Sequence, residues 1–221
     1  MKDILEQIGH CVEFGKINKS SPFPPDMKGQ EGADELSKQA LDKGINPNDV
    51  LQKALVPAME RVGKKFSENK IFVPQMLMSA KAMNMAMEHL KPYFQSGEVK
   101  RKGTVIIGTV SGDLHDIGKN LVAMMIEGGG WEIIDLGVDV KAKQFVNKLY
   151  DYPGAIVGMS ALLTTTMINM EDITKQIKEA FPGTKVIIGG APVTEKFKTQ
   201  IGADFYGPEP QSVLDYLNGL K

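Results

Sequence analysis

Residues 104–126 read TVIIGTVSGDLHDIGKNLVAMMI, and this stretch carries the pattern from which the rest of the chain is interpreted. An apolar, largely β-branched run at 104–110 is followed by a Gly/Asp break and then by helix-like apolar spacing at 121–126. This order predicts a strand, a loop and a helix. The loop at 112–120 then lies at the carboxyl end of a first strand, where open α/β sheets bind their ligands.

The loop carries an imidazole and two carboxylates, and two familiar phosphate-binding motifs do not describe it. A P-loop needs four residues between its glycines, whereas five separate Gly112 from Gly118, and Asn120 stands where a hydroxyl should be. The G-x-G-x-x-G spacing of a dinucleotide site is also missing from this turn. The spacing of Asp113 and His115 instead allows a carboxylate to hold one ring nitrogen while the other ligates a metal.

The composition limits the classes of protein to which the chain can belong. The 221 residues include 26 basic and 27 acidic side chains, so no charged field predicts a nucleic-acid partner. A single cysteine, Cys11, excludes a disulfide framework and a cysteine-based zinc site, and it fits a reducing compartment. The N-terminus lacks the apolar core of a signal peptide, and no apolar stretch is long enough for a membrane span. We therefore expect a soluble, cytoplasmic protein with no membrane partner.

The first part of the chain, residues 1–95, is predicted to be a helical bundle. Apolar residues recur at helical spacing in four segments that are separated by turn residues and by a proline-rich loop at 18–30. The last segment is rich in methionine, which indicates either a soft helical core or a face toward a large flat apolar ligand, and periodicity does not separate the two. A short polar stretch at 96–102 is typical of a domain linker. The four helical segments are 3–17, 33–41, 50–66 and 73–90.

The second part, residues 103–221, alternates between strand-like and helix-like patterns. Five such units predict a doubly wound α/β fold with a parallel sheet, and the flavodoxin-like strand order 2-1-3-4-5 is the commonest solution for five strands. The predicted strands are 104–110, 131–136, 154–160, 184–189 and 203–206, and the predicted helices are 117–128, 141–150, 166–180, 192–200 and 210–220.

The predicted strand order brings three loops to one crevice, because the chain reverses direction between the first and third strands. The first strand ends in the loop with Asp113 and His115, the third in hydroxyls at 160–166, and the fourth in Gly189 and Gly190. Each feature has a plainer alternative, since hydroxyls cap helices and glycines turn chains. Their convergence on adjacent strands favours a single binding site.

These residues resemble the D-x-H-x-x-G … S-x-L … G-G signature of cobalamin-binding domains. The matching segments are Asp113-Leu114-His115-Asp116-Ile117-Gly118, Ser160-Ala161-Leu162 and Gly189-Gly190, and their intervals match too. A helical domain followed by this α/β domain resembles the cobalamin module of methionine synthase. It is more similar still to the corrinoid proteins of anaerobic methyltransferase systems for methylamines, methanol, betaines or methoxylated aromatics. The resemblance covers roughly residues 33–221, and the loop at 18–30 departs from the shorter connection expected there.

The resemblance implies a cobalamin site in which His115 is the lower axial ligand of cobalt, Asp113 orients it and Thr166 completes the relay. The displaced dimethylbenzimidazole base would lie in a slot of the α/β domain, beside Ser160 and Thr164, with the nucleotide tail passing the paired glycines. The helical domain would cap the upper face of the cofactor. The implied cofactor contacts are Gly112, Asp113, Leu114, His115, Asp116, Ile117, Gly118, Ser160, Leu162, Thr164, Thr166, Gly189, Gly190, Tyr206 and Gly207, with Phe66, Val73 and Met76 in the cap.

The resemblance also implies a methyl carrier that is not catalytic alone. Cob(I)alamin would accept a methyl group from a substrate through a substrate-specific methyltransferase. Methylcob(III)alamin would pass it to a second methyltransferase acting on tetrahydrofolate or coenzyme M, and a reductive activase would rescue cob(II)alamin.

Other protein classes share parts of this pattern. A receiver domain needs a phosphoacceptor aspartate where Ser160 stands, and a flavin protein would be yellow rather than red or amber. A cobalamin-binding sensor or an adenosylcobalamin mutase subunit remains as the alternative function, although no DNA-binding helix-turn-helix or basic face is evident.

Overall fold

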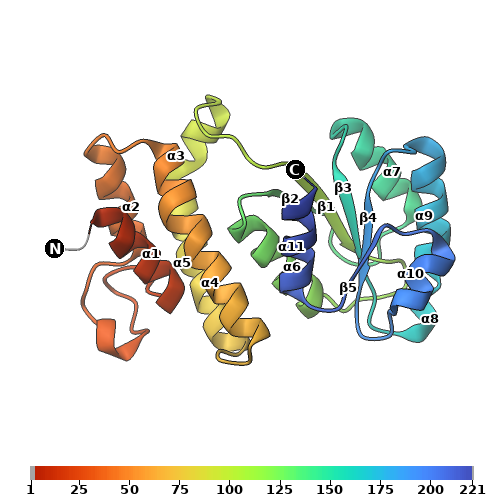
Figure 1. Ribbon diagram of the computed structural model, residues 1–221, viewed down its shortest axis with the longest axis horizontal. Coiled ribbons are helices and arrows are strands. Elements are labelled where there is room, and N and C mark those ends of the chain that lie inside the picture. The colour runs from red at the N-terminus through yellow and green to blue at the C-terminus, as the bar shows by residue number, and fades with distance from the viewer. Residues whose placement is uncertain (1–2, 221) are drawn as a thin grey trace. The chain divides into compact units, whose positions relative to one another are not determined.

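The computed structural model describes residues 3–220, apart from the side chain of Gln95, and the chain forms two compact units (Figure 1). The helical unit comprises residues 1–101 with 128–130, and the α/β unit comprises residues 102–127 and 131–221. Within the described residues, no helix is long and apolar enough to cross a membrane.

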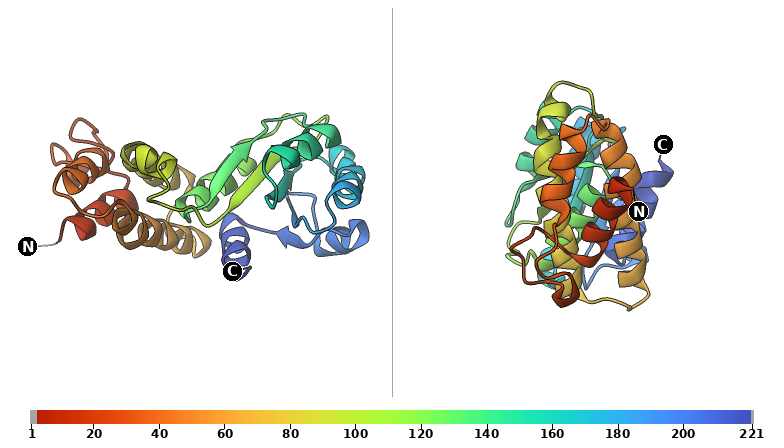
Figure 2. Two further views of the ribbon diagram at one scale, coloured as in Figure 1. Left: turned by 90° about the horizontal axis from the view of Figure 1, so that it is seen from above. Right: turned by 90° about the vertical axis from the view of Figure 1, so that its left-hand side faces the viewer.

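The helical unit is built from four main helices, α1, α2, α4 and α5, which pack side by side (Figure 2). Each turns an apolar face inward, with residues such as Ile8, Leu36, Val62 and Leu90 almost fully buried. The elements in order are α1 (Ile4–Phe14), the 3-10 turn η1 (Pro25–Met27), α2 (Ala33–Asp42), α3 (Pro47–Asp49), the π-helical turn η2 (Val50–Leu55), α4 (Val56–Ser67) and α5 (Val73–Gln95).

Two prolines shape the helical unit in ways that periodicity did not predict. The segment predicted as one helix at 50–66 begins as the π-helical turn η2, which ends two residues before Pro57, whose ring nitrogen has no hydrogen to donate. The helix predicted to stop before Pro92 continues to Gln95, so that expectation was wrong. Near a helix end the missing donor is tolerated, and the N–H of Ser96 still reaches the carbonyl of Pro92 at 3.0 Å.

The α/β unit contains a five-stranded, all-parallel sheet in the order β2-β1-β3-β4-β5, which confirms the predicted topology. Helices α7, α9 and α10 cover one face of the sheet, and α6 and α11 cover the other (Figure 1). The strands are β1 (Thr104–Thr109), β2 (Glu132–Asp135), β3 (Ile156–Ser160), β4 (Val186–Gly189) and β5 (Phe205–Gly207). The helices are α6 (Ile117–Gly128), α7 (Ala142–Asp151), α8 (Thr164–Met167), α9 (Asn169–Ala180), α10 (Glu195–Ile201) and α11 (Pro210–Gly219).

The helix predicted at 166–180 is divided into α8 and α9, with Ile168 between them. Its first turn starts earlier than predicted, at Thr164. The Thr166 hydroxyl bonds to the carboxylate of Asp113 on the β1 loop, so this turn is tied to the sheet and not continued as one regular helix.

The register of the sheet places the ends of four strands in one row. Thr109 of β1 pairs with Ser160 of β3, Ser160 with Gly189 of β4, and Gly189 with Gly207 of β5. Because parallel strands all end at the same edge, the loops that follow leave the sheet together.

Candidate functional site

The loop between β1 and α6 begins with a turn that requires glycine. Gly112 has φ +80°, a left-handed conformation that side chains with a Cβ rarely adopt. After this turn the chain folds back on β1, where the Thr109 hydroxyl donates to the carbonyl of His115 at 3.0 Å. Asp113 and His115 are thereby fixed beside the end of the strand.

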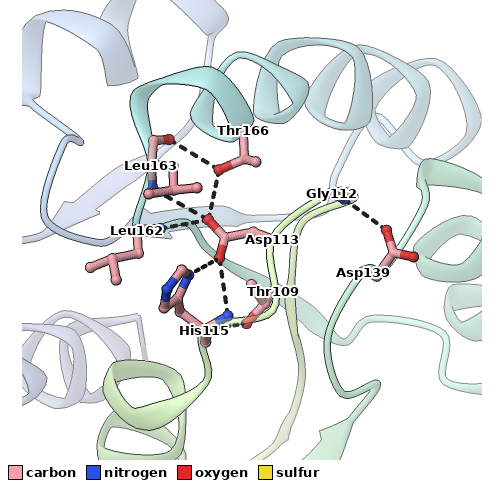
Figure 3. A network of polar contacts seen from close by, with 8 residues as sticks. All are labelled: Thr109, Gly112, Asp113, His115, Asp139, Leu162, Leu163 and Thr166. Atoms are coloured by element: carbon pink, nitrogen blue, oxygen red, sulfur yellow. Dashed lines mark hydrogen bonds and ion pairs between the residues drawn. The ribbon is translucent and has the colours of Figure 1, made fainter.

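The Asp113 carboxylate is fully buried and accepts five hydrogen bonds (Figure 3). Its Oδ1 atom accepts from the backbone N–H of His115 at 3.0 Å and from the ring Nδ1 of His115 at 2.8 Å. Its Oδ2 atom accepts from the N–H groups of Leu162 and Leu163, at 2.8 and 3.3 Å, and from Thr166 Oγ1 at 2.6 Å. The carboxylate therefore joins the β1 loop to the β3–α8 segment.

These hydrogen bonds settle the charge of the carboxyl group and the tautomer of the ring. Burial alone would raise the pKa of Asp113, but the hydrogen bonds from Thr166, the Leu162 N–H and His115 outweigh it and hold the pKa well below its ordinary value. An ionised carboxylate only accepts, so Nδ1 of His115 must carry the proton. The lone pair of the neutral ring then lies on Nε2, the nitrogen that a metal would bind.

The imidazole of His115 is accessible although its partner is not. Its side chain is 53% exposed, whereas that of Asp113 is 0% exposed. Among residues 3–220, no group of three or more His, Cys, Asp or Glu side chains is placed to hold a metal ion. A single imidazole is the ligand pattern of metals held in a macrocycle, as in haem proteins with a proximal histidine.

Four apolar side chains on the segments that carry or contact the Asp113–His115 pair are exposed to solvent. Leu114 and Ile117 are 72% and 74% exposed on the β1 loop and α6. Leu162 and Leu163, whose N–H groups donate to Asp113, are 45% and 44% exposed on the neighbouring segment (Figure 3). Several exposed apolar groups on neighbouring segments are typical of a binding surface. They fit a ligand that is largely apolar.

Of two other residues in the D-x-H-x-x-G segment, Asp116 and Gly118, only the first has a local explanation. The carbonyl of Asp116 accepts from the N–H of Asn120 at 2.8 Å, and its carboxylate accepts from the Asn120 amide at 3.1 Å, so Asp116 starts α6. Gly118 is different, since a Cβ at this position would meet no protein atom within 4 Å. Packing within the protein therefore does not require glycine there, and the space is open to a ligand.

The predicted tail contacts lie along the same edge of the sheet. Ser160 is half-buried at the end of β3, and Tyr206 and Gly207 end β5. Gly190 has φ +123°, and a Cβ there would come within 1.9 Å of the Ala161 carbonyl. A Cβ on Gly189 would approach the Gly207 carbonyl at 3.1 Å. These glycines keep the backbones of β3, β4 and β5 close, which explains them independently of any ligand.

The two threonines proposed for the site differ in environment. Thr164 is exposed at the start of α8, whereas Thr166 is 7% exposed. The Thr166 hydroxyl lies within reach of both Asp113 and the Leu163 carbonyl, and the charged, closer carboxylate is the stronger acceptor. Thr166 thus contacts the Asp113–His115 pair through Asp113.

The predicted cap residues belong to the helical unit. Met76 is fully buried, while Phe66 and Val73 are half-buried. Phe72, directly before α5, is 63% exposed and was not predicted. It lies outside the helical apolar stripe, so periodicity gives no signal for it.

Sequence reasoning also missed polar residues that hold the loop. Lys119, 2% exposed, forms an ion pair with Asp135 at the end of β2. Asp139, in the loop after β2, accepts from the N–H of Gly112 at 2.7 Å (Figure 3). Both contacts depend on the pairing of β1 with β2, which no local sequence pattern reveals.

Two family models match the chain. The B12 binding domain model matches residues 103–214, and a second model, also described as a B12 binding domain, matches residues 29–91. The matches together span the site and most of the helical unit.

Similar proteins and structures agree with these matches. The sequence is 42% identical over 195 residues to trimethylamine corrinoid protein 1 of Methanosarcina acetivorans, covering 86% of this chain and 90% of that protein. It is 41% identical over 179 residues to monomethylamine corrinoid protein 2 of the same organism, covering 78% and 82%. The structure matches a chain of the methanol:cobalamin methyltransferase complex from Methanosarcina barkeri with a TM-score of 0.84 and 28% identity, over 100% of this chain and 80% of that chain.

Proposed function

Because the chain belongs to the family of B12-binding corrinoid proteins, we propose that it is a methyl carrier in which His115 ligates the cobalt of cobalamin through Nε2. The observation that carries the proposal is the contrast within one hydrogen-bonded pair. Asp113 is buried and ionised, and His115 is exposed with its lone pair on Nε2. When bound, the corrin cobalt would supply the chemistry, because in its lowest oxidation state it is a nucleophile that can take up a methyl group.

The residues of this chain would hold the cofactor and tune its metal. Asp113 holds the proton on Nδ1, fixes the orientation of the ring and makes Nε2 a better electron donor. Leu114, Ile117 and Leu162 are exposed and would offer apolar area to the corrin. Ser160 and Thr164 would contact the displaced base, and Gly189 and Gly190 would face the nucleotide tail.

The chain is proposed to work between partners. A substrate-specific methyltransferase would deliver the methyl group, a second methyltransferase would pass it to tetrahydrofolate or coenzyme M, and a reductive activase would restore the active cobalt. One structural relative is named as part of a methanol:cobalamin methyltransferase complex, which supports a separate catalytic partner. The relatives named for trimethylamine and monomethylamine are almost equally identical to this chain, so several methyl donors must be compared.

The ligation is tested by paramagnetic resonance of cob(II)alamin bound to the protein. A ¹⁴N axial ligand splits each cobalt line into a triplet, and a ¹⁵N ligand splits it into a doublet. Protein labelled with ¹⁵N only in histidine should give doublets. Triplets from labelled protein would mean that the cofactor's own base is the ligand. His89→Gln is the matched control, because His89 pairs with Asp34 in the helical unit and should leave the doublets unchanged.

The carrier role is tested in a native extract from which the endogenous chain has been removed. Reduced, cobalamin-loaded protein is added with trimethylamine, monomethylamine or methanol, and the rise of methylcobalt absorbance is followed. At least one donor should methylate the protein, and His115→Asn should slow this reaction. Methylation that is independent of added donor, or absent with all donors of the family, would contradict the proposal.

A further inference from the structure

One peptide group of the β1 loop is held at both ends by side chains from other parts of the α/β unit. The carbonyl of Ser111 accepts from the Asn169 amide nitrogen at 2.8 Å. The N–H of Gly112 donates to Oδ1 of Asp139 at 2.7 Å (Figure 3). The two atoms belong to the same Ser111–Gly112 peptide bond, which lies one residue before Asp113.

The geometry of a trans peptide makes this a clamp. The C=O and N–H of one peptide point in opposite directions, so Asn169 and Asp139 hold the plane from opposite sides. Rotation of the plane would break both hydrogen bonds together. A peptide next to glycine is the one most free to rotate, and Gly112 already has φ +80°. The clamp acts where the loop has the greatest intrinsic freedom.

Asp139 has an unfavourable backbone conformation that its contacts explain. Its φ is +54°, in the left-handed region that costs non-glycine residues free energy. The residue is exposed, so apolar packing does not hold it in place. Its N–H donates to the Asp113 carbonyl at 3.1 Å while its carboxylate binds Gly112. Asp139 is thus strained and exposed, and both its N–H and its carboxylate bind the β1 loop. Such strain indicates a functional constraint.

We propose that Asp139 and Asn169 are positioning residues, which fix the Ser111–Gly112 peptide and so keep the Asp113–His115 pair in the arrangement that presents Nε2. Only the link from Nε2 to cobalt rests on the proposed function. The effect of Asp139 and Asn169 on the His115 ring can be measured in the protein without cofactor.

The test uses the full chain without cofactor and two NMR observables. Hydrogen exchange of the Gly112 N–H reports the clamp, and the ring ¹⁵N shifts of His115 report its tautomer. The chain has three histidines, and the ring signals of His115 are identified by their loss in His115→Asn. In Asp139→Ala, exchange should speed up about ten- to a hundredfold, the factor for one lost hydrogen bond to a charged group. The His115 ring should change from one tautomer, protonated at Nδ1, to a mixture.

Designed variants separate positioning from stability. Asp139→Asn keeps an acceptor oxygen and tolerates the left-handed conformation, so it should restore slow exchange and the single tautomer. Asp139→Gly relieves the backbone strain but lacks the acceptor, so its urea midpoint should not fall although its tautomers mix. Asn169→Asp places a carboxylate against the Ser111 carbonyl and should mix the tautomers, as Asn169→Ala should.

Matched controls lie on α7, which follows the loop of Asp139, and on α9, which begins with Asn169. Asp151 on α7 pairs with Lys148, and Asp172 on α9 accepts from Gln176, so Asp151→Ala and Asp172→Ala should leave both observables unchanged. An unaltered His115 tautomer in Asp139→Gly and Asn169→Asp would overturn the proposal, whatever the cobalt experiments show. If these variants mix the tautomers but the labelled wild type gives no histidine doublet with cob(II)alamin, the positioning role stands and the proposed ligation fails.

Discussion

Two aspartates at opposite edges of the sheet, Asp113 fully buried and Asp204 partly buried, accept hydrogen bonds from very different donors. Asp113, after β1 at the carboxyl edge, is surrounded by backbone N–H groups, a hydroxyl and an imidazole. Asp204, before β5 at the amino edge, accepts from Lys178, Lys185 and the N–H of Val186. The first carboxylate has no lysine or arginine among its donors, and the second has two lysines.

The difference in donors indicates a difference in role. Lys178 and Lys185 neutralise the charge of Asp204, and these ion pairs hold β4, β5 and α9 together. Neutral donors keep Asp113 ionised without cancelling its charge, and one of those donors is an exposed imidazole. The negative charge therefore remains available to polarise His115.

The largest effect is expected at His115, where function should be lost without loss of fold. Its side chain is 53% exposed and supplies one of the five hydrogen bonds to Asp113, so His115→Asn should lower the free energy of unfolding by only about 1 kcal/mol, the usual contribution of one hydrogen bond. The axial nitrogen splitting of bound cob(II)alamin should disappear completely. Urea denaturation and paramagnetic resonance on the same preparation measure both. If nitrogen splitting from the protein remains in His115→Asn, His115 is not the axial ligand. Asp113 would then have no functional role that distinguishes it from Asp204.

The next prediction compares removal of the two carboxylates. Asp113→Ala leaves the N–H groups of Leu162, Leu163 and His115 without their acceptor in a buried place, and should cost about 3–5 kcal/mol. Asp204→Ala frees lysines that are 28% and 48% exposed and can be rehydrated, and should cost about 1–2 kcal/mol. Unfolding in urea at neutral pH gives both values. A larger loss for Asp204→Ala would show that its lysines, not the neutral donors, form the more cooperative network.

The sequence revealed the parts of this molecule that have local patterns. The strand order could be predicted because alternating β and α segments restrict a five-stranded sheet to few topologies, and the D-x-H spacing marked Asp113 and His115. The resemblance to cobalamin-binding domains is confirmed by the family matches. Contacts that depend on which loops meet were not visible. Asp139 and Asn169 carry no motif, and the continuation of α5 past Pro92 contradicts the usual effect of proline.

The charge of Asp113 should also set the reduction potential of bound cobalamin. Asp113→Asn keeps the size of the side chain but loses the charge that enriches the imidazole. A weaker axial ligand stabilises cobalt(II) less, while cobalt(I) gains little from any axial ligand. Changes behind a metal ligand cost about 10–100-fold, and tenfold is about 59 mV for one electron, so the cob(II)/cob(I) potential should rise by some tens of millivolts.

Spectroelectrochemical titration of the loaded variant measures this shift. Asp204→Asn is the control and should leave the potential unchanged, because Asp204 lies at the other edge of the sheet. An unchanged or lower potential in Asp113→Asn would mean that the carboxylate orients the ring without tuning it.

Acid should weaken the amino edge of the sheet in a way that depends on salt. Burial would raise the pKa of Asp204, but hydrogen bonds from Lys178, the Val186 N–H and Lys185 outweigh it and lower the pKa. The stability from this group is therefore fully present above about pH 4, where the unfolded carboxyl titrates, and is lost as the pH falls through the lower folded pKa. The difference in unfolding free energy between wild type and Asp204→Asn should shrink below about pH 4, and added salt should reduce it at neutral pH. A difference that is independent of pH would refute the assignment.

The smallest effects are expected at Thr166, where hydroxyl and methyl can be separated. Thr166→Ser keeps the donor to Asp113 Oδ2 and removes one buried methyl group, so it should cost about 1 kcal/mol of stability and leave the cobalt potential unchanged. Thr166→Val keeps the shape and removes the donor. Asp113 then retains the two backbone N–H groups on Oδ2, and its charge is less shared, so more of it acts on His115. The cob(II)/cob(I) potential should therefore fall slightly in Thr166→Val, opposite in sign to Asp113→Asn. The same titration distinguishes the outcomes: equal potentials for the serine and valine variants would mean that the threonine hydroxyl serves only to anchor α8 to the β1 loop, and that the tuning ends at Asp113.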